Sequence, residues 1–267
     1  MQTEVALEGG WESGAARVGD VVLRRSGPQS DAVIAWLHHL HSRGVDFVPL
    51  PVDGGFAADG REQLRFIEGE SMHPRPWSDD AAWTIGRMLR QVHDASNTFE
   101  LPARAQWQPS SLRGLPGGRQ VIGHRDLGPW NILARNGEPV AFIDWDDAGP
   151  MGHIWDLVNV VWLNVQLHDD DVAELNGLPP LHDRARQARV LLDSYRLAAR
   201  DGARLVERMI EWAVRTAREE AIVCDVTPDT QSPAENGFPT LWAITWRVRA
   251  AAWMYDHRHE LEPALRH

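Results

Sequence analysis

The residues best suited to chemistry lie between His124 and Asn131, in the segment His-Arg-Asp-Leu-Gly-Pro-Trp-Asn. Asp126 offers a carboxylate that can accept a proton, and Asn131 offers an amide oxygen five residues later. Asp144 adds a second carboxylate thirteen residues after Asn131. A proton acceptor followed by two oxygen ligands, in this order and spacing, predicts phosphoryl transfer from a nucleoside triphosphate to a hydroxyl.

Each residue of this motif has an expected part in the reaction. Asp126 is the predicted general base for the attacking hydroxyl. Asn131 and Asp144 are the predicted ligands of Mg²⁺, which prefers hard oxygen donors. His124 is expected to hold the loop, because Asp126 already supplies the base. Either segment alone could be accidental, but two motifs at this distance with a hairpin-like spacer favour catalysis.

With these residues the chain resembles the aminoglycoside phosphotransferase and choline kinase-like family of small-molecule kinases. The resemblance rests on His124 to Leu133, on Ile143-Asp144-Trp145-Asp146 and on Gly149-Pro150 followed by Trp155-Asp156-Leu157. It implies that Asp156 supports the catalytic loop, although an ordinary carboxylate at a helix N-terminus explains this residue equally well. It also implies that the chain acts on a small-molecule hydroxyl with ATP and Mg²⁺.

The resemblance implies an α+β fold of two lobes, like that of protein kinases. Residues 1–68 are expected to form a small antiparallel-sheet lobe that binds the nucleotide. Residues 69–267 are expected to form a larger, mainly helical lobe for catalysis and for the acceptor. A protein acceptor is disfavoured, because Asp144 to Asp156 is too short for an activation segment and no Ala-Pro-Glu follows.

The nucleotide-binding residues depart from the usual kinase pattern, because all 27 basic residues are Arg. Aligning Val21-Val22-Leu23-Arg24 with the kinase strand that carries Lys places Arg24 against the phosphates and Val22, on the same face, against the adenine. The alternative interpretation is that Arg24 is an exposed residue on an edge strand and does not contact the phosphates. The sequence has no Glu between Glu12 and Glu62, so the usual ion pair from the first helix is either missing or rebuilt.

The rest of the nucleotide site is predicted from position alone. Adenine is expected to bind the backbone near Phe66, Ile67 and Glu68, where the two lobes join. Gly9-Gly10 and Gly14 stand in place of a regular glycine-rich loop. These departures keep open a second function, that of a catalytically weak nucleotide-binding or regulatory protein.

Local sequence patterns predict the elements that position these residues. A helix should begin near Ser30 and end at Gly44, and Asn136-Gly137 should turn a hairpin. A loop is expected at Thr227 to Pro239. Strands are predicted at Val18–Arg25, Asp46–Val52 and Gln63–Ile67, and further helices at 78–95, 154–168, 182–200, 202–223 and 238–258.

Composition narrows the partners. The net charge of -11 argues against nucleic acid and is compatible with a cationic acceptor. No apolar run approaches the length of a membrane span and the N-terminus lacks a signal-peptide pattern, so a cytoplasmic protein without membrane partners is expected.

The acceptor class is predicted only in outline. Thirteen Trp residues include a helical stripe of Trp242, Trp246 and Trp253, which is typical of core packing but could also face a sugar or an amine. An aminoglycoside-like antibiotic or another amino or sugar alcohol is the predicted acceptor, and the Arg-only composition suggests a GC-rich bacterial genome. The sequence leaves open the acceptor's identity, the choice between ATP and GTP, and the oligomeric state.

Overall fold

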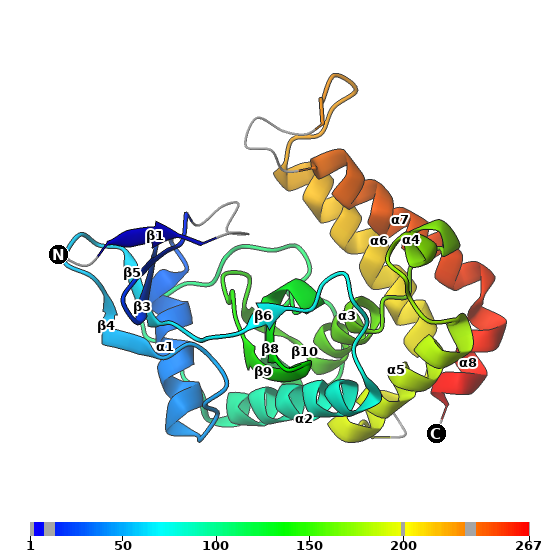
Figure 1. Ribbon diagram of the computed structural model, residues 1–267, viewed down its shortest axis with the longest axis horizontal. Coiled ribbons are helices and arrows are strands. Elements are labelled where there is room, and N and C mark those ends of the chain that lie inside the picture. Colours follow the sequence, from blue (N-terminus) through cyan, green and yellow to red (C-terminus); the bar gives the residue numbers. More distant parts are fainter. Residues whose placement is uncertain (1–2, 8–13, 199–200, 233–238, 267) are drawn as a thin grey trace.

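The N-terminal sheet (Figure 1) carries Val22 and Arg24, two of the residues predicted to contact the nucleotide, and Phe66, Ile67 and Glu68 follow directly after one of its strands. The computed structural model describes residues 3–7, 14–198, 201–232 and 239–266. Five antiparallel strands run in the order β1-β2-β3-β5-β4, and helix α1, Ser30–Ser42, connects β3 to β4. The strand bounds are β1 Glu4–Ala6, β2 Ala16–Val18, β3 Val21–Arg24, β4 Pro51–Phe56 and β5 Glu62–Arg65.

Two strand predictions in this lobe are wrong in their bounds. The strand predicted from Val18 to Arg25 is divided, because Gly19 has φ +64° and turns β2 back into β3. The strand predicted from Asp46 begins only at Pro51, since Val45 and Val48 are buried in the core ahead of it.

The predicted hairpin forms in the larger part of the molecule. Strands β8, Ile132–Arg135, and β9, Glu138–Phe142, are joined by Asn136 and Gly137, both with positive φ. Such turns match the right-handed twist of the strands. Strand β6, Glu70–Ser71, extends this sheet, whereas β7, Gln120–Gly123, pairs with β10, Gly149–Gly152, in a separate two-stranded sheet that the sequence analysis missed.

Helices form most of the remainder. Helix α2 begins after Ser78, whose hydroxyl accepts a hydrogen bond from the Ala81 N–H, as an N-cap should. Helices α2 and α5 pack together, as do α6 and α7. The helix bounds are α2 Asp79–Ala95, α3 His153–Asn164, α4 Asp170–Leu175, α5 Leu181–Tyr195, α6 Leu205–Val223, α7 Thr240–Asp256 and α8 Arg258–Leu265, of which α4 and α8 were not predicted.

Some helix predictions run too far. The helix predicted to reach residue 168 ends at Asn164, and Gln166 takes a positive φ. The helix predicted to reach residue 200 ends at Tyr195, because Arg196 is left-handed. Within the predicted loop from Thr227 to Pro239, residues 233–238 lie outside the described residues.

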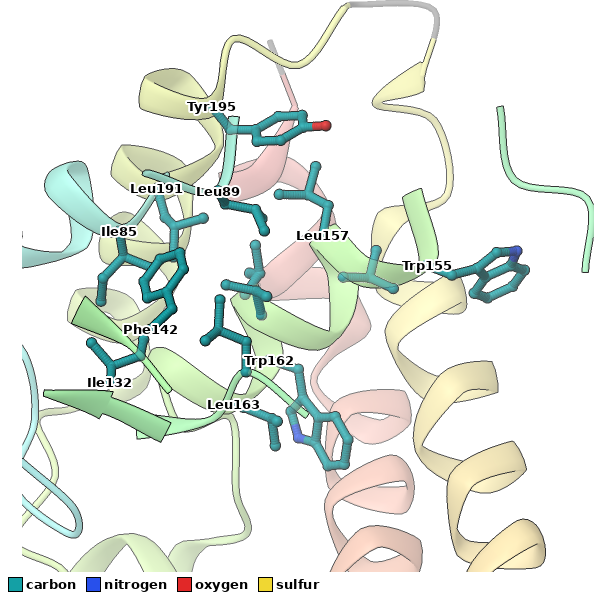
Figure 2. Packing of buried hydrophobic residues seen from close by; sticks show 14 of the residues in the cluster. Ile85, Leu89, Ile132, Phe142, Trp155, Leu157, Trp162, Leu163, Leu191 and Tyr195 are labelled. Carbon is teal, nitrogen blue, oxygen red and sulfur yellow. The ribbon is translucent and has the colours of Figure 1, made fainter. Parts of the chain in front are cut away.

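Helix α3 forms the centre of the main core, and all of its residues are buried. Its Leu157 lies near Leu89 of α2 and Tyr195 of α5 (Figure 2). This packing places α3 directly behind the catalytic loop. Together, the antiparallel sheet and the mainly helical remainder confirm the predicted α+β, kinase-like fold class. In the part of the chain that the structure describes, no helix has both the length and the apolar character that crossing a bilayer requires.

Candidate active site

The loop after β7 brings Asp126 together with Asn131. Pro129 starts a short 3-10 turn, Pro129–Asn131, which directs Trp130 and Asn131 back toward Asp126. Asp126 Oδ2 accepts hydrogen bonds from Asn131 Nδ2 at 2.9 Å and from Trp130 Nε1 at 3.2 Å. Asn131 Nδ2 also donates to the Asp126 carbonyl at 2.8 Å. The carboxylate is therefore fixed at one oxygen.

The electrostatic surroundings suit Asp126 to proton transfer near neutral pH. Burial and the negative charge of Asp147 raise the pKa of Asp126 to about 7, against the opposing effects of Trp130 and Arg247. A base is most effective when its pKa lies near the working pH.

Asp156, at the start of α3, holds the backbone of this loop. Its side chain is completely buried. The Oδ2 atom accepts from the His124 N–H at 3.1 Å, and Oδ1 accepts from the Arg125 N–H at 2.8 Å. His93 Nε2 completes the set at 2.9 Å. Although burial alone would raise the pKa of Asp156, the hydrogen bond and charge of His93 and the bond from Arg125 lower it.

His124 joins the loop to the segment before Asp144. Its ring is buried beside Trp145, with 4.5 Å between the ring centroids, and its Nε2 lies 2.9 Å from the Ile143 carbonyl. Burial lowers the pKa of His124, so the ring is neutral at pH 7. Because a carbonyl only accepts, Nε2 must carry the proton.

Asp144 comes directly after Ile143, whose carbonyl binds His124, and takes a left-handed backbone conformation with φ +62°. The Ile143 N–H donates to the Asn131 carbonyl at 2.9 Å, so the backbone links the two predicted metal ligands. Because the amide nitrogen of Asn131 is used by Asp126, its oxygen remains for a cation. An amide oxygen and a carboxylate fit Mg²⁺.

Asn131 and Asp144 supply only two protein oxygens, so phosphate oxygens would have to complete the coordination of Mg²⁺. Among the described residues, no three His, Cys, Asp or Glu side chains are grouped so that they could hold a metal ion. Mg²⁺ is commonly held by one or two protein groups together with substrate phosphates, which is the arrangement that Asn131 and Asp144 permit.

Arg24 reaches across to the same acidic segment. Its Nε donates to Glu62 at 2.5 Å, its Nη1 to Asp144 at 3.2 Å and its Nη2 to Asp146 at 2.6 Å. The Ser30 hydroxyl donates to the other oxygen of Glu62. Burial alone would lower the pKa of Arg24, but Asp146, Glu62 and Asp144 raise it, so the guanidinium stays charged.

This network corrects two interpretations of the sequence. The alternative of an exposed Arg24 on an edge strand is wrong, since Arg24 is 6% exposed and β3 lies inside the sheet. The helix predicted to begin near Ser30 does so, but Gln29 occupies the cap position and the Ser30 hydroxyl donates to Glu62 instead of capping the helix. The sequence analysis sought a Glu on the helix, whereas Glu62 lies opposite Arg24 in the register of β3 with β5.

The structure places the other predicted nucleotide-binding residues around the end of β5. Val22 is half-buried and shares a strand with Arg24. Phe66 and Ile67 are half-buried and Glu68 is exposed. The Phe66 N–H already donates to the Asp20 carbonyl at 2.8 Å, and the Glu68 carbonyl accepts from Arg135 at 2.9 Å. Gly9-Gly10 lie outside the described residues, and Gly14 has φ +55°.

A small pocket of about 30 Å³ opens beside Asp126. Of the predicted Trp stripe, only Trp246 lines it, stacked on Trp162 with 5.2 Å between their centroids. Trp242 is exposed on the surface, and Trp253 is buried with its Nε1 bound to Asp170. No sequence pattern indicates this pocket, because its walls come from segments far apart in the chain.

Comparison with known proteins identifies the family of this chain. Residues 95–206 match the phosphotransferase enzyme family. The trifolitoxin immunity protein of Rhizobium leguminosarum bv. trifolii is 45% identical over 265 residues, which cover 99% of this chain and all of the relative.

Solved structures confirm the fold. The microcompartment-associated aminopropanol kinase is 17% identical with a TM-score of 0.65, covering 99% of this chain and 94% of that one. A choline/ethanolamine kinase family protein from Mesorhizobium loti is 17% identical with a TM-score of 0.61, covering 99% and 92%. A spectinomycin phosphotransferase in complex with ADP and spectinomycin is 12% identical with a TM-score of 0.58, covering 97% and 94%.

Proposed function

The chain belongs to the phosphotransferase enzyme family and shares its fold with small-molecule kinases, so we propose that it transfers the γ-phosphoryl group of ATP to a hydroxyl of a small toxic or antibiotic molecule. The observation that carries the proposal is Asp126, fixed at one carboxylate oxygen and set beside a pocket. The full-length relative is named for immunity to trifolitoxin, which supports a toxin as acceptor. Aminoglycoside-like antibiotics and other amino or sugar alcohols belong in the same screen.

Asp126 is the proposed general base. Both hydrogen bonds to its side chain go to Oδ2, so we assign Oδ1 to the acceptor hydroxyl. As the hydroxyl proton moves to Oδ1, the oxygen attacks the γ-phosphorus and the bond from that phosphorus to ADP breaks. Trp130 and Asn131 keep the carboxylate oriented, and Asp156 keeps the loop backbone in place.

Asn131 and Asp144 are the proposed ligands of Mg²⁺, and His124 and Asp156 support them. When bound, Mg²⁺ neutralises charge on the triphosphate. Arg24 is proposed to contact the phosphates in place of the usual Lys, with Val22 beside the adenine and the backbone of Phe66, Ile67 and Glu68 at its edge. Both ATP and GTP belong in the first assays, since a related fold was solved as a GDP complex.

Asp126→Asn tests the base. We expect acceptor-dependent ADP release to fall by about 10²-fold or more, the usual contribution of a general base, while ATP affinity stays within about twofold. Asp94→Asn, an exposed acid on α2, is the matched control and should keep full activity. Undiminished turnover in Asp126→Asn would refute the assignment.

A catalytically weak nucleotide-binding protein is the second candidate. It is favoured by one observation, the ion pair of Arg24 with Asp144, which engages the carboxylate that the nucleotide-bound cation would use. Saturable ADP release that depends on a hydroxylated acceptor excludes this candidate. ATP binding without turnover, across toxins, aminoglycosides and amino alcohols, would establish it.

A further inference from the structure

The pocket beside Asp126 has an unusual balance of charge for a site expected to receive an amine. Of the described residues, Asp126 is the only acidic one that lines it, whereas Arg125 and Arg247 both do. The other lining residues are neutral: Trp130, Asn159, Trp162, Leu163, Thr216 and Trp246.

The two arginines differ in whether an acidic side chain balances their charge. Arg125 Nη2 donates to Glu219 at 2.9 Å, and this ion pair is largely buried. Arg247 Nη1 donates only to the Ala243 carbonyl, at 2.8 Å on the same helix. Within the described ranges, no Asp or Glu forms an ion pair with Arg247.

Nearby acids do not cancel the charge of Arg247. Glu219 is occupied by Arg125 and by the hydroxyls of Ser110 and Ser111. Asp147 acts on Asp126 electrostatically but does not line the pocket. The pocket therefore presents a cation near the base, with no acid except Asp126 itself to receive a substrate amine.

The remaining wall is aromatic. Trp246 stacks on Trp162, lies edge-on to Trp130 with 6.4 Å between centroids, and has the Arg247 guanidinium 5.7 Å from its ring. Such a wall can contact an apolar or aromatic group that lies against the pocket, whose volume of about 30 Å³ is too small to enclose a ring. The guanidinium fork matches a carboxylate, to which it can donate two parallel hydrogen bonds.

We propose that the acceptor carries a carboxylate that pairs with Arg247, next to an apolar or aromatic group that packs against Trp246 and a hydroxyl that faces Asp126. This inference rests on the proposed function, because it names the substrate class of the same site. The net charge suggested a cationic acceptor, but net charge acts over long distances, whereas the groups in contact with the substrate decide its affinity.

Three probes with the same ring and the same secondary hydroxyl test the charge directly: 3-phenyllactate is anionic, its primary amide is neutral and 1-amino-3-phenylpropan-2-ol is cationic. Binding is measured by quenching of tryptophan fluorescence in the presence of ATP and Mg²⁺. We expect 3-phenyllactate to bind about tenfold or more tightly than the amide, and 1-amino-3-phenylpropan-2-ol to bind most weakly.

Variants assign that preference to Arg247. Arg247→Gln should reduce the preference for the acid below about twofold, and Arg247→Lys should keep part of it. Arg249→Gln is the matched control, because Arg249 lies two residues along α7 and binds Asp169 and Asp171 instead. Thermal midpoints show whether each variant is folded.

Several results would overturn the inference: tighter binding of the amide or the amine, no binding of 3-phenyllactate at millimolar concentration, or an acid preference that survives Arg247→Gln. ATP affinity is measured in the same samples. Normal ATP binding with the wrong charge preference refutes the carboxylate and leaves the proposed phosphotransferase function standing, whereas a native chain that binds neither ATP nor GTP refutes that function.

Discussion

Removing the charge of Glu62 is expected to destabilise the N-terminal sheet and weaken nucleotide binding. Glu62 is 1% exposed and Arg24 7% exposed at the side chain, so their ion pair is closed off from water. Removing one partner of a buried pair typically costs about 3–5 kcal/mol, because the other charge stays buried. Here Arg24 keeps Asp144 and Asp146, and a Gln can still accept from Ser30.

We therefore expect Glu62→Gln to lower the free energy of unfolding by about 2–3 kcal/mol, below the full cost of an orphaned charge. The control is Glu70→Gln. Glu70 pairs with Arg75 at 2.9 Å, but both side chains are more than half exposed. An exposed pair contributes about 0–1 kcal/mol, so the same chemical change should have little effect there.

Urea unfolding followed by circular dichroism measures both variants, and ATP titration measures the nucleotide site. The midpoint for Glu62→Gln should fall clearly below that for Glu70→Gln, and ATP affinity should fall because Arg24 loses the carboxylate that fixes its Nε. Equal midpoints for the two variants would show that the buried pair contributes no more than a surface one, and the reasoning about Arg24 would fail.

Two further substitutions test packing and pH. Burial and the charges of Arg184 and His73 lower the pKa of His168 to about 3, so below pH 6.5 the unfolded chain takes up a proton that the folded chain excludes. The free energy of unfolding should therefore fall as pH drops from 6.5 toward 3. His168→Gln should flatten that decline by up to about 1.4 kcal/mol per pH unit, which unfolding measured at pH 7 and pH 5 would show. Gly86→Ala in α2 should destabilise the protein by about 1–3 kcal/mol, because the new methyl group would lie 2.4 Å from the Leu191 carbonyl oxygen. This cost should exceed the gain from the better helix propensity of Ala. Thermal unfolding measures the effect, and a stabilised variant would contradict this packing.

Features set by neighbouring residues could be predicted from the sequence. Asn136-Gly137 specifies a two-residue hairpin turn because both residues tolerate positive φ, and the hairpin formed as predicted. Ser78 caps α2 for a similarly local reason, since its hydroxyl needs only the N–H three residues on.

Features set by contacts between distant segments could not be predicted from the sequence. The pairing of β7 with β10 depends on a loop that returns after the hairpin, and Gly149–Gly152 has little strand character of its own. The pocket at Asp126 joins the catalytic loop to α3, α6 and α7, so the cation that Arg247 adds there has no signature along the chain. The roles of the proposed site residues stay predictions, because they concern contacts with bound nucleotide, metal and acceptor.

Arg24 shows how one substitution can reorganise a site. A Lys presents a single ammonium point charge, whereas a guanidinium presents donors in a flat fork that can serve several carboxylates at once. In this chain the fork uses Nε for Glu62 and its two terminal nitrogens for Asp144 and Asp146. A partner that binds Nε must lie beside the strand, and a cross-strand residue does so. Glu62 on β5, opposite Arg24 in the register of the two strands, meets this requirement.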